Sequence, residues 1–301
     1  MTHKPLLSRS LVAALALATL VPTARADENL LGYTTGAEAL PQGATEGYFW
    51  YTQRNDKGSG HYAARDYKAE LEYGFTHRFT GSLALHGLGI DTHGLTIDGY
   101  LPKDERYGFK ASGIQLGMKY NILSPVKDGL GLSIYIEPSY FWKDPHSGQD
   151  KDSYKLETQL LLQKNFMDDT LVWVGNLGFE GTWAKRKAIA DLPPGFDWPT
   201  TPEMEIELSA KTGVSYRFAP NWFVGGEVVY QTEFETEVGQ ERWSVFAGPS
   251  LHYGSKQWWA TLTWMPQLAG GGASTYPGQP EHLQLVEKTK QEIRLKLGYN
   301  F

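Results

Sequence analysis

The chain has 301 residues, 28 basic and 34 acidic side chains, a formal net charge of −6 and no cysteine. The absence of cysteine excludes thiol catalysis and cysteine-ligated metals, and the acidic balance argues against nucleic acid as a partner. Hydrophobic residues make up 41% of the chain and the mean hydropathy is −0.40. Composition alone therefore does not indicate a membrane protein.

The start of the chain has the three parts of a secretory signal peptide. A basic start precedes the apolar stretch Leu11–Val21, and the small residues Ala24 and Ala26 stand at the cleavage position. We therefore expect a cleaved signal peptide at residues 1–26 and an exported chain that begins near Asp27. A short membrane anchor is the alternative, although the apolar stretch is short for a membrane-spanning helix.

The rest of the chain alternates between amphipathic runs of period two and breaks rich in glycine, proline, aspartate, asparagine or lysine. Period two indicates β-strands with one apolar face and one polar face. The runs predict about twelve strands, at residues 44–54, 62–77, 80–91, 107–121, 129–143, 153–166, 170–185, 203–218, 221–234, 243–254, 257–267 and 288–301.

The breaks between these runs alternate in length. Those at 77–81, 165–169, 218–221 and 253–257 are short, 121–129 is somewhat longer, and those at 92–106, 143–152, 185–203 and 266–288 are long. Short turns at one end and long loops at the other are typical of bacterial outer-membrane β-barrels. We therefore predict an all-β fold: an antiparallel transmembrane β-barrel of about twelve strands over residues 44–301. Residues 27–43 are expected as a short periplasmic N-terminal lead-in.

Charged side chains keep to one face of each predicted strand. In the run 203–218, for example, Ile206 and Leu208 alternate with Glu205 and Glu207. A secreted β-sandwich could show the same alternation with its apolar face turned inward. The positions of the aromatic residues are what separate the two folds.

Tyrosine and tryptophan mark the ends of the apolar stripes, as in the aromatic girdles of membrane barrels. The expected girdle residues are Trp173, Trp183, Trp222, Tyr230, Trp243, Tyr253, Trp258 and Trp264. Their separation along tilted strands gives a band roughly 20–25 Å tall, which matches an outer-membrane hydrocarbon layer. A soluble core has no reason to place tryptophan at strand ends, and outer-membrane lipid is the expected partner of this face.

The last ten residues, EIRLKLGYNF, alternate between apolar and polar side chains and end on an aromatic residue. They resemble the C-terminal recognition strand of bacterial outer-membrane β-barrel proteins. The resemblance implies that Tyr299 and Phe301 are read as an assembly signal by the barrel-assembly machinery. The stretch DENLLGYTTGAEALPQGATEGYFW also resembles a functionally uncharacterised family of Gram-negative outer-membrane proteins, and this second resemblance implies no activity. We expect the protein to be a monomer.

The polar strand faces would place charges of both signs inside the barrel. The expected lining residues are Asp66, Lys68, Glu70, Glu72, Glu137, Glu157, Glu180, Lys211, Arg217, Glu227, Arg294 and Lys296. Two interpretations remain open: a charged lining of a narrow pore for small polar solutes, or a salt-bridge network that fills the barrel. The mixed signs predict no strong preference for anions or cations.

An outer-leaflet lipid enzyme is a further alternative, with candidate residues in His146–Gly148 and Asp91–His93. Adjacent residues on one loop are badly placed for a nucleophile and its base to bond, and no histidine pair has metal-ligand spacing. We therefore assign no catalytic residue, no metal and no cofactor. A narrow passive pore is the leading hypothesis, and a closed structural or adhesion barrel is the other alternative.

Deleting Phe301 tests the assembly signal. An aromatic side chain at the rim of the barrel gains only part of the roughly 1.5–3 kcal/mol that full burial provides, so we expect the truncated protein to refold in detergent nearly as well as the full chain. In cells we expect its outer-membrane level to fall, because an unassembled chain is exposed to aggregation and degradation. Unchanged outer-membrane levels, measured by immunoblotting of membrane fractions, would show that Phe301 is not read as a signal.

Overall fold

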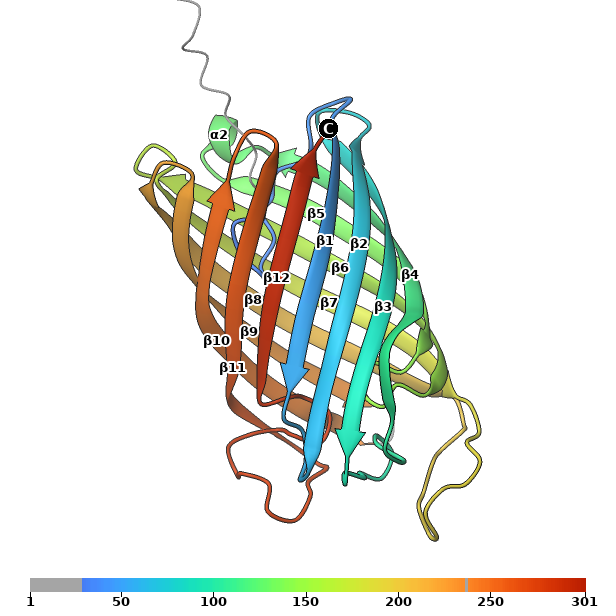
Figure 1. Cartoon of the computed structure of the whole chain (residues 1–301). Coiled ribbons are helices and arrows are strands. Elements are labelled where there is room, and N and C mark those ends of the chain that lie inside the picture. The colour runs from blue at the N-terminus through green and yellow to red at the C-terminus, as the bar shows by residue number, and fades with distance from the viewer. Residues whose placement is uncertain (1–28, 236–237) are drawn as a thin grey trace, which may run out of the picture.

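The computed structural model describes residues 29–235 and 238–301, so the expected signal peptide lies outside the described residues. Twelve strands form a closed antiparallel barrel in which each strand pairs with its sequence neighbours and β1 pairs with β12 (Figure 1). The strands are β1 (Thr45–Asn55), β2 (His61–Gly74), β3 (Phe79–His93), β4 (Arg106–Leu123), β5 (Gly131–Lys143), β6 (Asp150–Phe166), β7 (Leu171–Arg186), β8 (Glu203–Ala219), β9 (Trp222–Glu235), β10 (Gly239–Gly254), β11 (Trp258–Gly272) and β12 (Gln291–Asn300). The predicted fold class is confirmed.

The two ends of the barrel differ, as the lengths of the breaks predict. Short turns join the strands at the end where β1 begins and the C-terminus lies, and the four-residue helix α2 (Pro125–Asp128) lies in the longest of them (Figure 1). The longest connections, residues 94–105, 187–202 and 273–290, lie at the other end. We call these the short-turn end and the long-loop end. Within the described ranges, no helix is long and apolar enough to cross a membrane.

The closure between β1 and β12 runs through ten residue pairs, from Glu46 opposite Asn300 to Asn55 opposite Gln291. The backbone N–H of Phe301 adds a hydrogen bond to the carbonyl oxygen of Thr45, at 3.1 Å. A closed barrel pairs the backbone groups of both would-be edge strands, which is what a strand needs in a hydrocarbon layer.

The largest difference from the predicted strands concerns β11, for which the sequence predicts an end at Gln267. It continues to Gly272, which lies opposite Arg242 at the start of β10. The glycine-rich sequence indicates a loop, but here the glycines allow close strand contact. A Cβ atom at Gly272 would lie 2.4 Å from the carbonyl oxygen of Glu241.

The outer face of the barrel is apolar, and the charged side chains of the predicted strands point mostly inward. Leu71, Leu208 and Leu262 are all more than two-fifths exposed, whereas Lys68 and Glu233 on the same or neighbouring strands are buried. This arrangement is the inverse of a soluble β-sandwich, in which the apolar side chains fill the interior, so that alternative is excluded.

Aromatic side chains cluster toward both ends of this outer face. Tyr253 packs against Trp222 and Trp258 near the short turns, with ring centroids 4.9 and 4.7 Å apart. Near the long loops, Tyr154 lies 5.7 Å from Trp183. All the predicted girdle residues, including Trp173, Tyr230, Trp243 and Trp264, are at least partly exposed.

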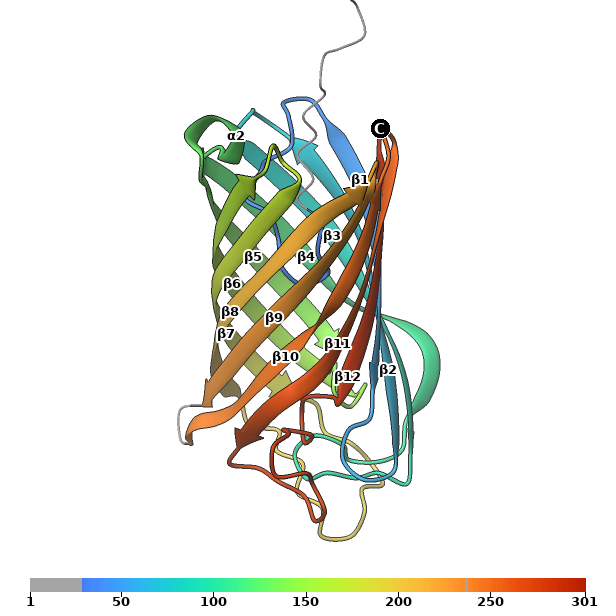
Figure 2. The same ribbon diagram turned by 90° about the vertical axis from the view of Figure 1, so that its left-hand side faces the viewer.

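Of the expected lead-in at residues 27–43, the part that the structure describes lies inside the barrel (Figures 1 and 2). The chain turns at the rim, where Gly43 has a φ of 81° and the N–H of Ala44 donates to the carbonyl of Pro41. Leu31 and Ala37 are fully buried against the inner wall. We call residues 29–41 the plug.

Leu208→Arg and Gln231→Arg compare the two faces of neighbouring strands. We expect Leu208→Arg to lower the free energy of unfolding by about 2–4 kcal/mol, because a charge would enter the hydrocarbon layer. Gln231→Arg should cost much less, because its side chain faces the interior and already donates to Glu207 at 2.8 Å. Denaturant titration of both variants in lipid bilayers checks this, and equal effects would contradict the assignment of the two faces.

Candidate functional site

One carboxylate of the barrel wall holds the plug in place. Glu227, on β9, accepts hydrogen bonds from the backbone N–H groups of Gly32, Tyr33 and Thr34 at 2.6, 2.8 and 2.8 Å, and from the Thr34 hydroxyl at 2.9 Å. Three successive N–H groups that converge on one anion form a concave anion-binding nest. Glu227 is 2% exposed, so these charge-assisted hydrogen bonds replace the water that it loses on burial.

Amide side chains of the wall hold the remainder of the plug. Asn176 accepts from the N–H of Thr35 and donates to its carbonyl oxygen, both at 2.8 Å. Gln163 accepts from the N–H of Ala37 at 3.0 Å. The plug thus satisfies its backbone through wall side chains and joins no β-sheet.

The wall is also shaped to fit the plug. A Cβ atom at Gly213 would lie 2.6 Å from Cδ1 of Leu31, so glycine is needed where the plug approaches the wall. Leu30 and Leu31 pack on Val172 and Val174 in a small apolar cluster. The plug therefore has a defined seat on β7 to β9, near the short-turn end.

A second closure lies at the long-loop end, where residues 56–60, 144–149 and 285–288 meet over the barrel mouth. We call these residues the cap. The N–H of Gly58 donates to the carbonyl of Leu285 at 2.9 Å, and Arg54 donates to the carbonyl of Pro145 at 2.7 Å. Hydrogen bonds thus join the segments of the cap to one another and join the cap to β1.

A histidine links the charges of the cap. The Nζ of Lys57 lies 3.0 Å from Nδ1 of His146, and Nε2 of His146 lies 3.5 Å from Oε1 of Glu287. Glu287 also forms an ion pair with Arg242 of β10. Burial, then the positive charges of Lys57 and Arg54, hold the pKa of His146 well below its usual value. A neutral ring accepts from Lys57 at Nδ1 and donates to Glu287 at Nε2.

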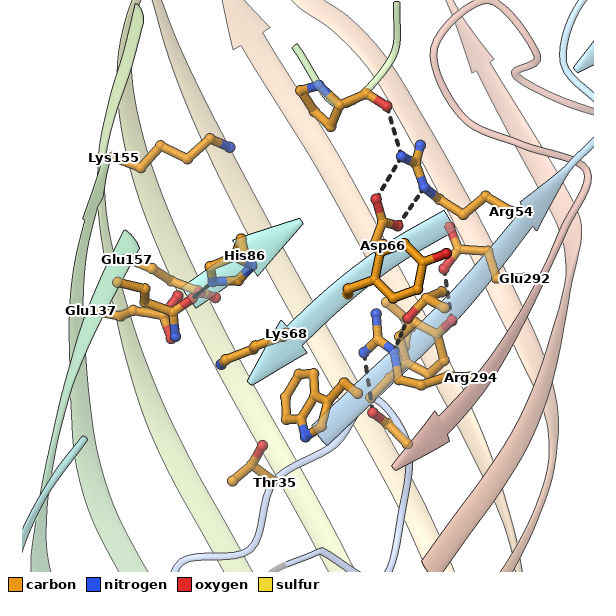
Figure 3. A pocket seen from close by; sticks show the side chains of 18 of the residues that line it. Thr35, Arg54, Asp66, Lys68, His86, Glu137, Lys155, Glu157, Glu292 and Arg294 are labelled. Carbon is orange, nitrogen blue, oxygen red and sulfur yellow. Dashed lines mark hydrogen bonds and ion pairs between the residues drawn. The ribbon is translucent and has the colours of Figure 1, made fainter. Parts of the chain in front are cut away.

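Between the plug and the cap lies a cavity of about 490 Å³, which we call the chamber (Figure 3). Of the predicted lining residues, it is bordered by Asp66, Lys68, Glu72, Glu137, Glu157, Lys211 and Arg294. Residues from the plug, including Tyr33, and from the cap, including His146, also border it. A volume of this size is typical of a site for a small solute.

A row of glutamates crosses five adjacent strands of the inner wall, and two of its members, Glu137 and Glu157, border the chamber. Glu137, Glu157, Glu180, Glu207 and Glu233 lie directly opposite one another from β5 to β9. Directly opposed like charges destabilise a sheet, so this row needs compensation. We call it the glutamate row.

Cations compensate the glutamate row unevenly. Lys155 lies 2.7 Å from Glu180, and Lys288 lies 2.6 Å from Glu233. Among the described residues, the one cation within 4.0 Å of Glu157 is Lys211, at 3.9 Å, and Gln159 donates a hydrogen bond to Glu157 at 2.8 Å. Glu137 accepts hydrogen bonds from Gln115 and Tyr135 at 2.5 and 2.6 Å. The compensation thus weakens toward the β5 end of the row.

The opposite wall, formed by β12, β1 and β2, gathers cations around one aromatic ring. Lys68 and Lys296 lie 4.4 Å from the ring centre of Trp50, and Arg294 lies 5.3 Å from it. Arg294 also covers the ring of Tyr33 in the plug, at 3.8 Å. Cation–π contacts of this kind hold positive charge without an anion.

The other predicted lining residues do not border the chamber. Glu70 is paired with Lys68 at 2.6 Å, and Glu180 borders a smaller neighbouring cavity of about 200 Å³. Lys296 donates to Asn29 of the plug at 2.7 Å, while Glu227 anchors the plug. Arg217 is exposed at the short-turn end, where it donates to the carbonyl of Asp168.

The structure does not favour the enzyme candidates. Both ring nitrogens of His146 are engaged by Lys57 and Glu287, which leaves neither for Ser147. His93 is exposed beside Asp104 in the β3–β4 region. Among the residues that the structure describes, no group of three or more histidine, aspartate or glutamate side chains could hold a metal ion.

Several chamber residues were not singled out in the sequence analysis. They are Tyr33, Trp50, His86, Gln115, Lys119, Tyr135, Lys155 and Glu292. The strand alternation already turned Trp50, His86 and Gln115 inward, but their neutral side chains gave no reason to select them. Tyr33 had no such signal, because the plug lacks a periodic pattern.

The sequence matches one protein family model over residues 23–301, nearly its whole length. The chain belongs to a family of unknown function, DUF6662. Among curated proteins, none matches the sequence.

Solved structures share the fold at low sequence identity. The COG4313 outer membrane channel from Pseudomonas putida F1 has a TM-score of 0.56 and 14% identity, and the match covers 88% of this chain and 98% of that one. The KdgM porin matches with a TM-score of 0.43 and 11% identity, over 84% and 99% of the two chains. LpxR from Salmonella typhimurium matches with a TM-score of 0.48 and 6% identity, over 85% and 100%. The similarity to the Pseudomonas putida F1 channel, at a TM-score of 0.56, shows that the fold is that of an outer-membrane barrel.

The cap should loosen in acid through His146. Burial lowers the pKa of His146 in the closed cap. In a released loop, a histidine has a pKa of about 6.5. The His146 ring therefore binds a proton less tightly when the cap is closed than when the loop is released. The contribution of His146 to the stability of the closed cap is therefore fully present above about pH 6.5 and is lost as the pH falls below that value.

A spin label on Ser59→Cys, in a chain with no other cysteine, measures this loosening. Protonation of His146 loosens the cap in acid, so we expect His146→Gln to make the label less mobile at pH 5, relative to pH 7.5, than it is in the unmodified protein. The variant is the necessary comparison, because burial raises the pKa of Glu287 to about 8. Glu287 therefore stabilises the cap in acid, in both proteins. An identical pH response in the two proteins would contradict the role of His146.

Proposed function

We propose that this protein is an outer-membrane channel for small polar solutes, kept narrow at rest by the plug and the cap. The observation that carries the proposal is the polar chamber of about 490 Å³ between two closures that belong to no β-sheet. Lipid would surround the apolar outer face, and the barrel-assembly machinery would insert the chain as a monomer.

The plug is held in a way that allows displacement without damage to the barrel. Its polar anchors include Glu227, Asn176 and Gln163, together with Thr80, which accepts from the N–H of Leu40 at 2.9 Å. None of these hydrogen bonds is part of the strand pairing. Movement of the plug therefore leaves all twelve strands paired and opens the chamber toward the short-turn end.

A salt-bridge network alone would account for the paired charges but not for the cavity. A network that fills the barrel has no need of the unoccupied volume that the chamber provides. The similarity to an outer membrane channel from Pseudomonas putida F1 concerns the fold and agrees with a channel function. Proteins that conduct small solutes combine a charged lining with a constriction, and the plug provides one here.

Conductance across planar bilayers tests the proposal. We expect the full chain to conduct weakly, and deletion of residues 29–41 to raise the single-channel conductance by a factor of about three or more, because conductance follows the width of the constriction. Glu227→Gln should act in the same direction with a smaller effect, since an amide cannot accept from three N–H groups as a carboxylate does.

Glu281→Gln is the matched control, because Glu281 is exposed in the β11–β12 loop far from the plug. It should conduct like the full chain. Folding of the deletion variant is checked by gel migration that changes on heating, as is typical of a closed barrel. If the variant folds and still does not conduct, the channel proposal is wrong and a closed structural barrel is the better account.

A further inference from the structure

We infer that the chamber binds a small zwitterion, with its carboxylate on Arg294 and its ammonium group between Glu137 and Glu157. The inference rests on the proposed function, because the solute must reach the chamber through the channel. It names the class of solute that the chamber recognises.

The first support is a guanidinium that lacks an anion. Arg294 donates from Nε to the hydroxyl of Thr52 at 2.9 Å and from Nη1 to the carbonyl of Gly32 at 3.1 Å. Within residues 29–235 and 238–301, no carboxylate lies within 4.0 Å of it and Nη2 has no acceptor. Arginine presents a planar fork of donors that fits a carboxylate. Arg294 borders the chamber, so this fork is available to a solute there.

The second support is a carboxylate that lacks a cation. Gln115 and Tyr135 both donate to Oε2 of Glu137, at 2.5 and 2.6 Å. Among the described side chains, none donates to Oε1, and no lysine or arginine lies within 4.0 Å of this carboxylate. The two hydrogen bonds orient Glu137, and its other oxygen remains available to the chamber.

A second carboxylate stands beside the first. Glu157 lies directly opposite Glu137 in the β5–β6 pairing, and its cation Lys211 is 3.9 Å away. Two directly opposed carboxylates repel each other, and a shared cation between them relieves this repulsion. A primary ammonium group has three donors and suits such a pair.

The two charged groups face the same cavity from different walls. Figure 3 shows Glu137 and Glu157 on one side of the pocket and Arg294 on the other. The chamber volume of about 490 Å³ leaves room for a short chain between them. A solute with charges at both ends satisfies both walls, whereas a simple anion or cation leaves one wall unpaired.

Most of the other charges of the chamber are matched, but Glu292 has no cation within 4.0 Å among the described residues and accepts a hydrogen bond from Tyr33 at 2.7 Å. Lys68 is paired with Glu70 at 2.6 Å, and Arg54 is paired with Asp66 at 2.7 Å. One more carboxylate oxygen, Oε2 of Glu72, is buried without a partner among the described atoms. The chamber thus offers more free acid than free base, which favours a ligand whose cationic end is strongly bound.

Calorimetry with the detergent-folded protein tests the inference. The probes are glycine, 4-aminobutyrate and 6-aminohexanoate, with butyrate and butylammonium as singly charged analogues. We expect one amino acid of the series to bind about tenfold more tightly than either analogue, which corresponds to about 1.4 kcal/mol. The preferred length reports the distance between the two charged groups. Equal affinities for zwitterion and analogues, or no dependence on length, would overturn the inference.

Two variants test the two charged ends of the ligand separately. Arg294→Gln should weaken zwitterion binding about tenfold, or about 1.4 kcal/mol, and leave butylammonium unchanged. Glu137→Gln should weaken zwitterion binding and leave butyrate unchanged. Arg294 also contacts the plug, so a second variant is needed. Arg294→Lys keeps the positive charge but lacks the paired N–H donors of the guanidinium group, and it should lower the affinity for the zwitterion by less than Arg294→Gln does.

Arg217→Gln and Glu281→Gln are the matched controls, since both side chains are exposed away from the chamber. They should bind the zwitterion like the full chain, and a loss equal to that of Arg294→Gln would overturn the assignment. If the plug-deletion variant conducts but no zwitterion binds, this inference fails and the channel stands. If zwitterions bind but no variant conducts, the site stands and the channel proposal fails.

Discussion

The interior of this barrel depends on the contact between Glu227 and the backbone of residues 32–34. A buried carboxylate without a cation is costly unless donors surround it, and four hydrogen bonds from the plug provide those donors. This contact sets the depth at which the plug enters the barrel. The position of Tyr33, and through it the position of Arg294 at 3.8 Å, follows from that depth.

The two open interpretations of the charged interior each describe part of it. Pairs such as Lys155 with Glu180 and Arg54 with Asp66 form a network that braces neighbouring strands. Such half-buried pairs stabilise modestly by themselves, because desolvation offsets most of their attraction. The unmatched groups, above all Glu137, border the open volume. The barrel therefore combines a braced wall with a polar space, and the proposed solute site lies in the polar space.

The sequence was sufficient for the strands, because alternation along one strand is a local property. It was not sufficient for the glutamate row, since Glu137 and Glu157 meet only through the register between β5 and β6. The plug was missed for a related reason: its partner Glu227 is 193 to 195 positions away in the chain. The extension of β11 over its glycines was missed because glycine favours loops in general and here serves close contact.

The turn at Gly43 ties the plug to the barrel rim, since the N–H of Ala44 donates to the carbonyl of Pro41 and β1 begins at Thr45. A displaced plug would therefore remain within a few residues of its seat. Its return is an intramolecular step with an effective concentration of about millimolar, as for other short tethers. A soluble peptide with the sequence of the plug would compete poorly against it. In the proposed channel, the tether as well as the contacts would therefore hold the plug in its resting position.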